Sequence, residues 1–310
     1  MFDRDVIIIG GGPAGLTAGL YLSRAKRRTL LLDKDTVGGY IRNIELVENY
    51  PGFTDGIAGA QLASEMVKQA GKYGLQTELA EVTRIEIFSS TRWVGCSKGQ
   101  GYTTNCVIIA GGSRHKKLGV PGEEELAGKG VFSCAFCDGS HFADRVVAVC
   151  GGGDSGINEA IYMAKIASKV IVLEVMPELT ATAVLRDRVR NNPKIEVRCN
   201  ASVEAILGNN KVEAIKYLDT ANQKKETINV DGVLVQIGLD PETDYLEGII
   251  PLDDQGFIIV NDRMETEVPF VLAAGDIRSG SPRQVVTAVG DGAIAAITAE
   301  RLLQEEGVTL

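Results

Sequence analysis

The hydrophobic pattern begins with a short apolar run that ends at a group of glycines. Residues 5–9 read DVIII and are followed directly by glycines. A continuous β-branched run of this length predicts a strand that is buried on both faces of a parallel sheet. A helical pattern over residues 13–25 and a second apolar run over 29–33 come next. Together they predict a strand–helix–strand unit of the kind found in α/β domains.

The same pattern recurs about 140 residues later. An apolar strand ends at Cys150, a glycine turn and a helix follow, and the next strand ends at Glu174. We interpret the two units as copies of one dinucleotide-binding domain. Residues 269–277 predict a further strand, and residues 281–303 predict a long helix. The predicted fold class is α/β, with two Rossmann-like three-layer domains, the second inserted into the first.

Two segments in which proline lies near glycine, at 118–125 and 238–244, mark the crossings at which the chain passes between the two predicted domains. Proline fixes the local backbone, and glycine permits a turn. The sequence therefore predicts one discontinuous domain of residues 1–117 and 245–310, with residues 118–244 inserted as a second domain. Two connections would give an axis for rotation of one domain against the other. Two domains are also the first expectation for a chain of 310 residues.

Charge and composition disfavour several classes of function. A net charge of −9 disfavours nucleic acid as a partner, because phosphates require a basic surface. The N-terminal apolar run stops at glycines, so we expect neither a signal peptide nor a membrane span. Six cysteines spread over a long chain favour a cytoplasmic protein with reduced thiols over a disulfide scaffold.

The first glycine loop has the spacing of a dinucleotide-binding site. Gly10, Gly12 and Gly15 follow the first strand in G-x-G-x-x-G order, and Asp33 ends the next strand. In this motif the glycines allow a tight turn and close approach of a pyrophosphate, and the carboxylate accepts from a ribose hydroxyl. The context predicts dinucleotide binding. The alternative is a turn that only packs helix against strand.

The second glycine loop repeats this spacing. Its candidate nucleotide-binding residues are Gly151, Gly153, Asp154, Ser155, Gly156 and Glu174. Selectivity for NADPH requires a basic residue just past the second strand, to bind the 2′-phosphate. No Arg or Lys occurs between Lys169 and Arg186. NADPH is therefore disfavoured, and it stays open whether this second site works at all.

Cys134 and Cys137 form a C-x-x-C pair with Asp138 directly behind it. A zinc site would need two further ligands, and the chain has no second C-x-x-C, so we expect no metal. A buried, inert pair is the plain alternative. A redox role for the pair explains its surroundings best. A helix start lowers a thiol pKa, and Asp138 can exchange a proton with a thiolate. Two dinucleotide folds would supply a flavin and an electron source.

Further motifs fall in the order typical of one family. They are VENYPGF at 47–53, VIIAGGSRHKKLGVPGE at 107–123, CAFCDG at 134–139, GGGDSG at 151–156, VLAAGDIR at 271–278 and RQVVTAVGDG at 283–292. With these motifs the chain resembles the low-molecular-weight thioredoxin reductase family over nearly its whole length. The resemblance implies FAD, a homodimer, two alternating domain orientations and a thioredoxin-like protein disulfide as substrate.

The resemblance also implies roles for single residues. Cys137 would face the flavin, Cys134 would attack the partner's disulfide, and Asp138 would be the acid or base. A helix beginning near Arg283 would point its positive end at the flavin ring. The residues implied to bind FAD are Gly10, Gly12, Pro13, Ala14, Gly15, Asp33, Lys34, Gly39, Asn49, Ala110, Gly111, Gly275, Asp276, Arg283, Gln284 and Val285.

One departure from the family concerns the electron donor. The family usually has a basic cluster after the second strand of the inserted domain, where this chain has Glu174, Val175, Met176 and Thr180. In this segment the chain resembles archaeal and anaerobic relatives, which use NADH poorly or take electrons from ferredoxin or a deazaflavin. Two alternatives to a disulfide reductase remain from the residues: a flavin-dependent NADH oxidase-type enzyme, and a non-enzymatic FAD-binding module.

Overall fold

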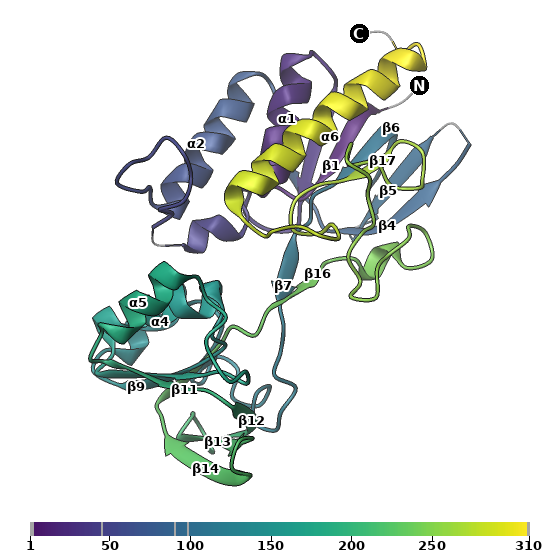
Figure 1. Cartoon of the computed structure of the whole chain (residues 1–310). Coiled ribbons are helices and arrows are strands. Elements are labelled where there is room, and N and C mark those ends of the chain that lie inside the picture. The colour runs from purple at the N-terminus through teal and green to yellow at the C-terminus, as the bar shows by residue number, and fades with distance from the viewer. Residues whose placement is uncertain (1–2, 45, 90, 98, 309–310) are drawn as a thin grey trace. The chain divides into compact units, whose positions relative to one another are not determined.

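The computed structural model describes residues 3–44, 46–89, 91–97 and 99–308. The chain forms two compact units (Figure 1): unit 1 is Met1–Arg114 with Asp240–Leu310, and unit 2 is His115–Leu239. The first crossing therefore lies a few residues before the predicted segment 118–125, whereas the second lies within the predicted segment 238–244. They fall in the short strands β7 (Ser113–His115) and β16 (Leu239–Pro241), which pair with each other.

The predicted first crossing, residues 118–125, belongs to unit 2. Within it the Glu123 carboxylate accepts from the N–H groups of Leu118 and Gly119, at 2.8 and 2.7 Å. The Ile206 N–H, on a strand of unit 2, donates to the Pro121 carbonyl at 2.9 Å. The proline and glycine of this segment thus shape a turn that is bonded to its own unit.

Unit 1 is built on a sheet with the strand order β3-β2-β1-β6-β5-β4, in which β17 also pairs with β6. Its elements are β1 (Arg4–Ile9), α1 (Pro13–Arg24), β2 (Thr29–Asp33), η1 (Tyr40–Asn43), α2 (Gly59–Lys72), β3 (Gln76–Leu79), β4 (Val82–Ile87), β5 (Arg92–Cys96), β6 (Gly101–Ile109), η3 (Asp244–Leu246), β17 (Val271–Ala273) and α6 (Val285–Glu305). Strands β1, β2, β3, β6 and β17 run parallel.

The uninterrupted apolar run of β1 follows from burial on both faces. Val6 and Ile8 pack in the cluster that includes helices α1 and α6, which Figure 1 shows beside α2 on one face of the sheet. Ile7 and Ile9 pack in a second cluster, with residues of β4, β5 and the segment after η3. A polar side chain at any of these positions would lie in one of the two cores. This explains why the sequence of the strand is continuously apolar.

Unit 2 has a parallel sheet with the order β11-β10-β9-β15-β8. Its elements are β8 (Val131–Phe132), α3 (Ala135–Asp138), η2 (Gly139–Phe142), β9 (Val146–Cys150), α4 (Asp154–Ile166), β10 (Lys169–Leu173), α5 (Ala183–Arg190), β11 (Ile195–Arg198), β12 (Ala201–Leu207), β13 (Ala214–Asp219), β14 (Lys224–Asn229) and β15 (Gly232–Val235). One core lies between this sheet and helices α4 and α5, and the other lies between it and the antiparallel sheet β12-β13-β14.

The predicted α/β class with two Rossmann-like three-layer domains is confirmed. In unit 1, β1 lies between β2 and β6, and in unit 2, β9 lies between β10 and β15. The glycines repeat as well. A Cβ atom added at Gly15 would collide with the Gly10 carbonyl oxygen, and one added at Gly156 would collide with the Gly151 carbonyl oxygen. Both helices therefore lie closer to their strands than a side chain would allow.

The long C-terminal helix α6 begins at Val285, later than the sequence pattern predicts. Arg283 has a positive φ of 58°, and Gln284 is extended, so neither can belong to the helix. Gln284 is the N-cap and forms a capping box with Thr287. Neither α6 nor any other described helix is long and apolar enough to cross a membrane.

Candidate functional site

A cavity of about 750 Å³ opens in unit 1 where β1 and β2 end. Gly10, Asp33, Lys34 and Gly111, all predicted cofactor residues, line it. Ligands of open parallel sheets bind beyond the carboxyl ends of the strands, at the point where the strand order reverses. Here the strand order reverses at β1, which pairs with β2 on one side and with β6 on the other. The cavity therefore lies where a dinucleotide is expected.

The first glycine loop is shaped for close approach of a ligand. Gly10 has a φ of +102°, and a Cβ atom there would collide with the Ala110 carbonyl. Gly39, at +66°, comes so close that its added Cβ would lie 2.7 Å from the Cα atom of Gly12. Asp33, at the end of β2, fixes the loop, because its Oδ2 atom accepts from the Gly11 N–H at 2.6 Å.

Replacing Gly10 by alanine is expected to weaken FAD binding by tenfold or more. Alanine would be strained at this φ, by about 1–3 kcal/mol, and its Cβ would displace the loop from Ala110. The measurement is the FAD content and the dissociation constant of the purified protein. Gly71→Ala is the control, because Gly71 lies in α2 with nothing within 4 Å of an added Cβ. Equal FAD affinity in the Gly10 variant and the wild type would contradict this role for the loop.

Residues far apart in the sequence meet at the start of α6. The Asn49 side-chain amide donates to the Gln284 Oε1 atom at 2.9 Å, across 235 residues. Gly275 lies against Ala14 at the start of α1, since an added Cβ would be 2.9 Å from the Ala14 Cβ. Val285, the first residue of α6, packs on the small cluster that also contains Ile41. The predicted cofactor residues of these segments therefore belong to one region of unit 1.

Asp276 has a half-buried carboxylate with one long hydrogen-bond contact in the protein. Its contact is the Ser281 hydroxyl, whose oxygen lies 3.5 Å from Oδ1. Burial raises the pKa of Asp276, although the nearby Arg283 lowers it. The adjacent Gly275 is held by Asp291, which accepts from the Gly275 N–H at 3.1 Å and from Arg278 Nε at 2.6 Å. Because its contact with Ser281 is long, this carboxylate can still accept from the hydroxyl groups of a ribityl chain.

Lys34 and Arg283, also predicted cofactor residues, have side-chain partners within the protein as well. Lys34 Nζ lies 3.1 Å from Glu242 Oε1, at the rim of the cavity. The Arg283 guanidinium stacks over the Phe257 ring, 4.8 Å from its centroid. Sequence reasoning missed Glu242 and Tyr245, which also line the cavity. No motif marks them, because they follow the second crossing and reach the cavity only through the fold.

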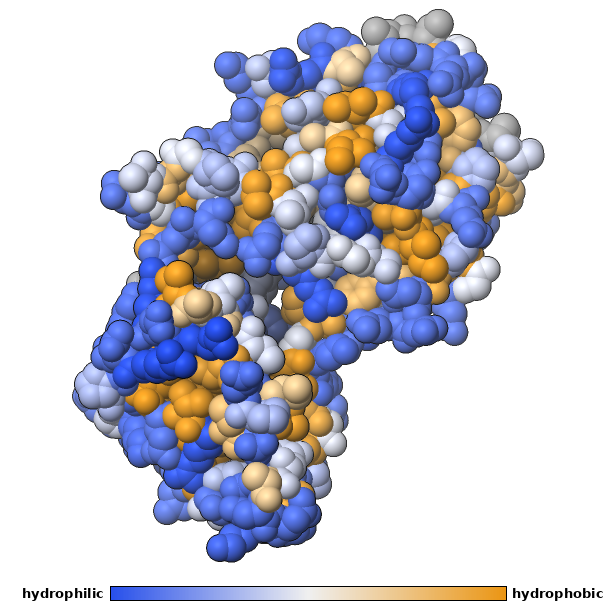
Figure 2. Space-filling model, viewed as in Figure 1, coloured by the Kyte–Doolittle hydropathy of each residue, from blue (hydrophilic) through white to orange (hydrophobic). Residues whose placement is uncertain are grey.

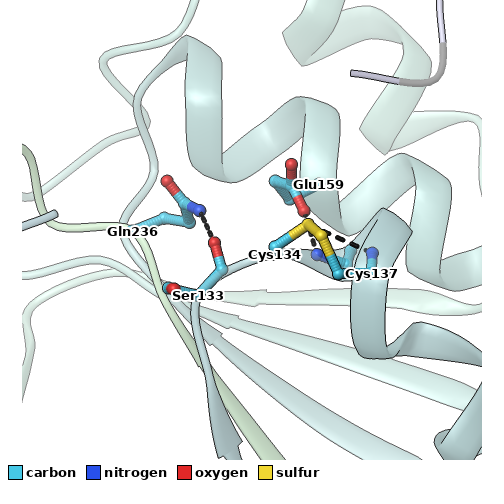
Figure 3. Close-up of a disulfide and its surroundings, with 6 residues drawn as sticks. Ser133, Cys134, Cys137, Glu159 and Gln236 are labelled. Carbon is cyan, nitrogen blue, oxygen red and sulfur yellow. Dashed lines mark hydrogen bonds between the residues drawn. A yellow bond between two sulfur atoms is a disulfide. The ribbon is translucent and has the colours of Figure 1, made fainter. Parts of the chain in front are cut away.

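The C-x-x-C pair of unit 2 is a disulfide (Figure 3). The Cα atoms of Cys134 and Cys137 are 5.4 Å apart, and the Cys137 N–H donates to the Cys134 sulfur at 3.1 Å. Cys134 is only 8% exposed, whereas Cys137 is exposed. Cys134 is the N-cap of helix α3, as a C-x-x-C at a helix start predicts, but α3 has only four residues, so its dipole is small and the Cys137 N–H is the group seen to contact the sulfur.

Two residues that the sequence did not point to fix the backbone around the disulfide. Glu159 of α4 accepts from the Ala135 N–H at 2.6 Å, and Gln236, just after β15, donates to the Ser133 carbonyl at 2.7 Å (Figure 3). Burial raises the pKa of Glu159 to about 7. Asp138, the predicted acid or base, is half-buried at the end of α3. No spacing rule could have found Glu159 or Gln236.

The second glycine loop repeats the geometry of the first. Glu174 is buried, and its carboxylate accepts from the N–H groups of Gly152 and Met176, at 2.6 and 2.9 Å. Asp33 binds the N–H groups of Gly11 and Asp35 in the same way. The predicted nucleotide residues are close neighbours: Gly151, Gly153, Asp154, Ser155 and Gly156 form the loop and the first turn of α4.

In the described part of the chain, no group of three or more His, Cys, Asp or Glu residues is arranged to hold a metal ion. The chemistry that the arrangement offers is thiol–disulfide exchange at Cys134 and Cys137, next to an intact dinucleotide fold. Two such folds in one chain, one of them carrying a disulfide, define a dinucleotide-dependent oxidoreductase that acts on disulfides.

The chain belongs to the pyridine nucleotide-disulphide oxidoreductase family, whose model matches residues 4–292. It is an enzyme of the disulfide oxidoreductase type. It is 41% identical over 308 residues to the thioredoxin reductase of Bacillus subtilis (strain 168), covering 99% of this chain and 96% of the relative. Membership implies FAD, and the glycine loop, the cavity and Asp276 fit that cofactor.

Two solved structures are similar over the whole chain. The thioredoxin reductase of Lactococcus lactis has a TM-score of 0.96 at 34% identity and covers 98% of this chain and 100% of that one. The thioredoxin reductase of T. acidophilum has a TM-score of 0.93 at 36% identity, with 100% of both chains covered.

Proposed function

We propose that this protein is an FAD-dependent reductase of thioredoxin-type protein disulfides. The observation that carries the proposal is the Cys134–Cys137 disulfide, which lies within the second dinucleotide fold of this chain. The chain matches the thioredoxin reductases named above over nearly their full length, and this match supports thioredoxin as the partner. An NADH oxidase-type enzyme is not favoured by these relatives, and a non-enzymatic module disagrees with the family.

When bound, FAD supplies a carrier that takes two electrons from a donor and passes them to a disulfide. In our proposal the backbone of the Gly10–Gly15 loop binds its pyrophosphate, and Asp33 accepts from its adenosine ribose. Asp276 accepts from the ribityl hydroxyls. The positive N-terminal end of the 21-residue helix α6 would stabilise negative charge on the bound ring.

In its reduced state the cysteine pair reduces the partner by thiol exchange. One thiolate attacks the partner's disulfide and forms a mixed disulfide, and the second sulfur then attacks that bond and releases the partner as a dithiol. Asp138 exchanges the proton. The resemblance assigns the first attack to Cys134, which is 8% exposed here. We propose, as the resemblance implies, that one of two alternating domain orientations exposes the dithiol to the partner.

We propose a donor other than NADPH, as in the archaeal and anaerobic relatives. Glu174 would repel a 2′-phosphate and would accept from a free 2′-hydroxyl. The segment that follows it carries no Arg or Lys before Arg186, whose guanidinium lies 3.9 Å from Glu178. NADH, reduced ferredoxin and a reduced deazaflavin are the candidate donors.

We also propose a homodimer that acts in the cytoplasm. Apolar residues gather in patches on a mostly hydrophilic surface in the view of Figure 2. Helix α6 exposes Ile294 and Ile297 by 39% and 60%, and α1 exposes Tyr21 by 41%. An isologous contact through unit 1 would cover such residues. Light scattering of the purified protein should give twice the mass of 33.1 kDa.

The direct test of the function is anaerobic reduction of an oxidised thioredoxin by the FAD-loaded protein. The thiols that appear on the thioredoxin are counted with each candidate donor in turn. Stoichiometric appearance of two thiols per two electrons supports the proposal. A protein that consumes its donor only when oxygen is present, and leaves the thioredoxin oxidised, would instead be an oxidase.

A further inference from the structure

Glu159 contacts the backbone between the two redox cysteines. It lies on α4, and its Oε2 atom accepts from the N–H of Ala135, the residue that follows Cys134, at 2.6 Å. Figure 3 shows its carboxylate beside the disulfide, on the side of α4. In the described part of the chain, this N–H is the group to which Glu159 is hydrogen-bonded, and Glu159 forms no ion pair with a cation.

Among the described residues, four cations on the neighbouring elements pair with carboxylates other than Glu159. Helix α4 packs against α3, η2, α5, β9, β10 and β11. On these elements Asp138 and His141 follow the disulfide, Lys169 and Arg198 pair with Glu196, Arg190 pairs with Asp187, and Arg186 faces Glu178. Arg188 lies on α5, and Lys165 near the end of α4 has its ammonium 5.6 Å from the Tyr162 ring. Burial is accordingly the main cause that raises the pKa of Glu159 to about 7.

We propose that Glu159 is a positioning residue that sets the reduction potential of the Cys134–Cys137 pair and makes it respond to pH. Reduction breaks the sulfur–sulfur bond with two electrons and takes up one proton to leave a thiol and a thiolate, or two protons to leave two thiols. The electrons come from the reductant of the disulfide oxidoreductase activity, and the protons come from solvent.

The charge of Glu159 beside the sulfurs determines in which direction the reduction potential of the cysteine pair changes with pH. Above pH 7 Glu159 is ionised, and its negative charge opposes a thiolate nearby, so the thiol pKa rises and the disulfide is harder to reduce. Below pH 7 the carboxyl group is neutral and this opposition disappears. The thiolate in turn raises the pKa of Glu159, because the two groups titrate as a coupled pair.

Glu159→Gln tests the proposal, since the amide keeps an oxygen acceptor for the Ala135 N–H and removes the charge. The cysteine pair is equilibrated with dithiothreitol redox buffers from pH 6 to 9, alkylated, and read by mass. We expect the thiol pKa to fall by about one unit, equivalent to a tenfold charge effect. Above the thiol pKa, the equilibrium constant for reduction should rise about tenfold, or about 30 mV. At pH 6 the variant and the wild type should agree within about twofold.

Glu125→Gln is the matched control. Glu125 is exposed in unit 2 and also accepts a backbone N–H, that of Gly122, at 3.1 Å. Its variant should leave the potential unchanged at every pH. Glu159→Asp keeps the charge and should retain the pH dependence of the wild type. If Glu159→Gln does not fold, the wild type is measured alone: its thiol alkylation rate should show a second inflection above pH 7, because the thiolate raises the pKa of Glu159, and a curve with the thiol inflection alone would overturn the inference.

An unchanged potential in Glu159→Gln would overturn the inference, and so would a shift of the same size at every pH, which would indicate a structural role alone. The inference rests on the proposed redox function of the pair, but the assay needs neither donor nor partner protein. A pair that does not equilibrate with the buffers at all would refute the redox function. A pair that equilibrates equally in the variant and the wild type would refute only the role of Glu159.

Discussion

Replacing Cys134 by serine is expected to reduce thioredoxin reduction by about 10³-fold or more, because a hydroxyl group neither exchanges with a disulfide nor forms one with Cys137. FAD should remain bound in a normal amount, since the cofactor residues belong to unit 1 and the disulfide to unit 2. The measurement pairs the rate of thiol formation on thioredoxin with the flavin absorbance of the same sample. Cys137→Ser should have an effect of similar size.

Cys199→Ser provides the control for this prediction. Cys199 is a partly exposed free thiol of unit 2, outside the disulfide. Its replacement should leave turnover unchanged. Unaltered thioredoxin reduction in Cys134→Ser would show that the electrons reach the partner by another route, and the proposed function would then be wrong.

The second large effect concerns the electron donor. NADPH at micromolar concentration is expected to bleach the flavin at least tenfold more slowly than the best of NADH, reduced ferredoxin and reduced deazaflavin. The physical reason is the buried Glu174 carboxylate beside the second glycine loop, where a 2′-phosphate would need a cation. The measurement is anaerobic stopped-flow absorbance with each donor in turn. NADPH as the fastest donor would contradict the prediction.

Thr180→Arg offers a gain-of-function version of this test. Thr180 is exposed, and its hydroxyl lies 3.6 Å from the position of a Cβ added at Gly153, so an arginine there reaches the loop. A charge-assisted hydrogen bond to the phosphate contributes about 1.5–3 kcal/mol, which is roughly tenfold or more in NADPH affinity. NADH should bind as before. If this variant gains nothing, the second glycine loop does not bind a nicotinamide dinucleotide in the expected way.

Most of the fold could be predicted because its signals are local. The apolar run of β1, the glycine loop and α1 lie within about 30 residues, and each is read from a period or a spacing. The same holds for β9, the second loop and α4. The predicted start of α6 is too early because Pro282 suits the first turn of a helix, whereas the positive φ of Arg283 excludes that residue from the helix.

The sequence by itself determined the two dinucleotide units, their glycine loops and the cysteine pair, because fixed residue types at fixed spacings suffice for each. Only the tertiary structure decided which distant groups meet. It brings Asn49 to Gln284, aligns Glu159 with the Ala135 N–H, and assigns residues 118–125 to unit 2. The physical reason is that such contacts depend on how helices and strands pack across the whole chain, and a hydrogen bond between remote residues leaves no periodic trace in either segment.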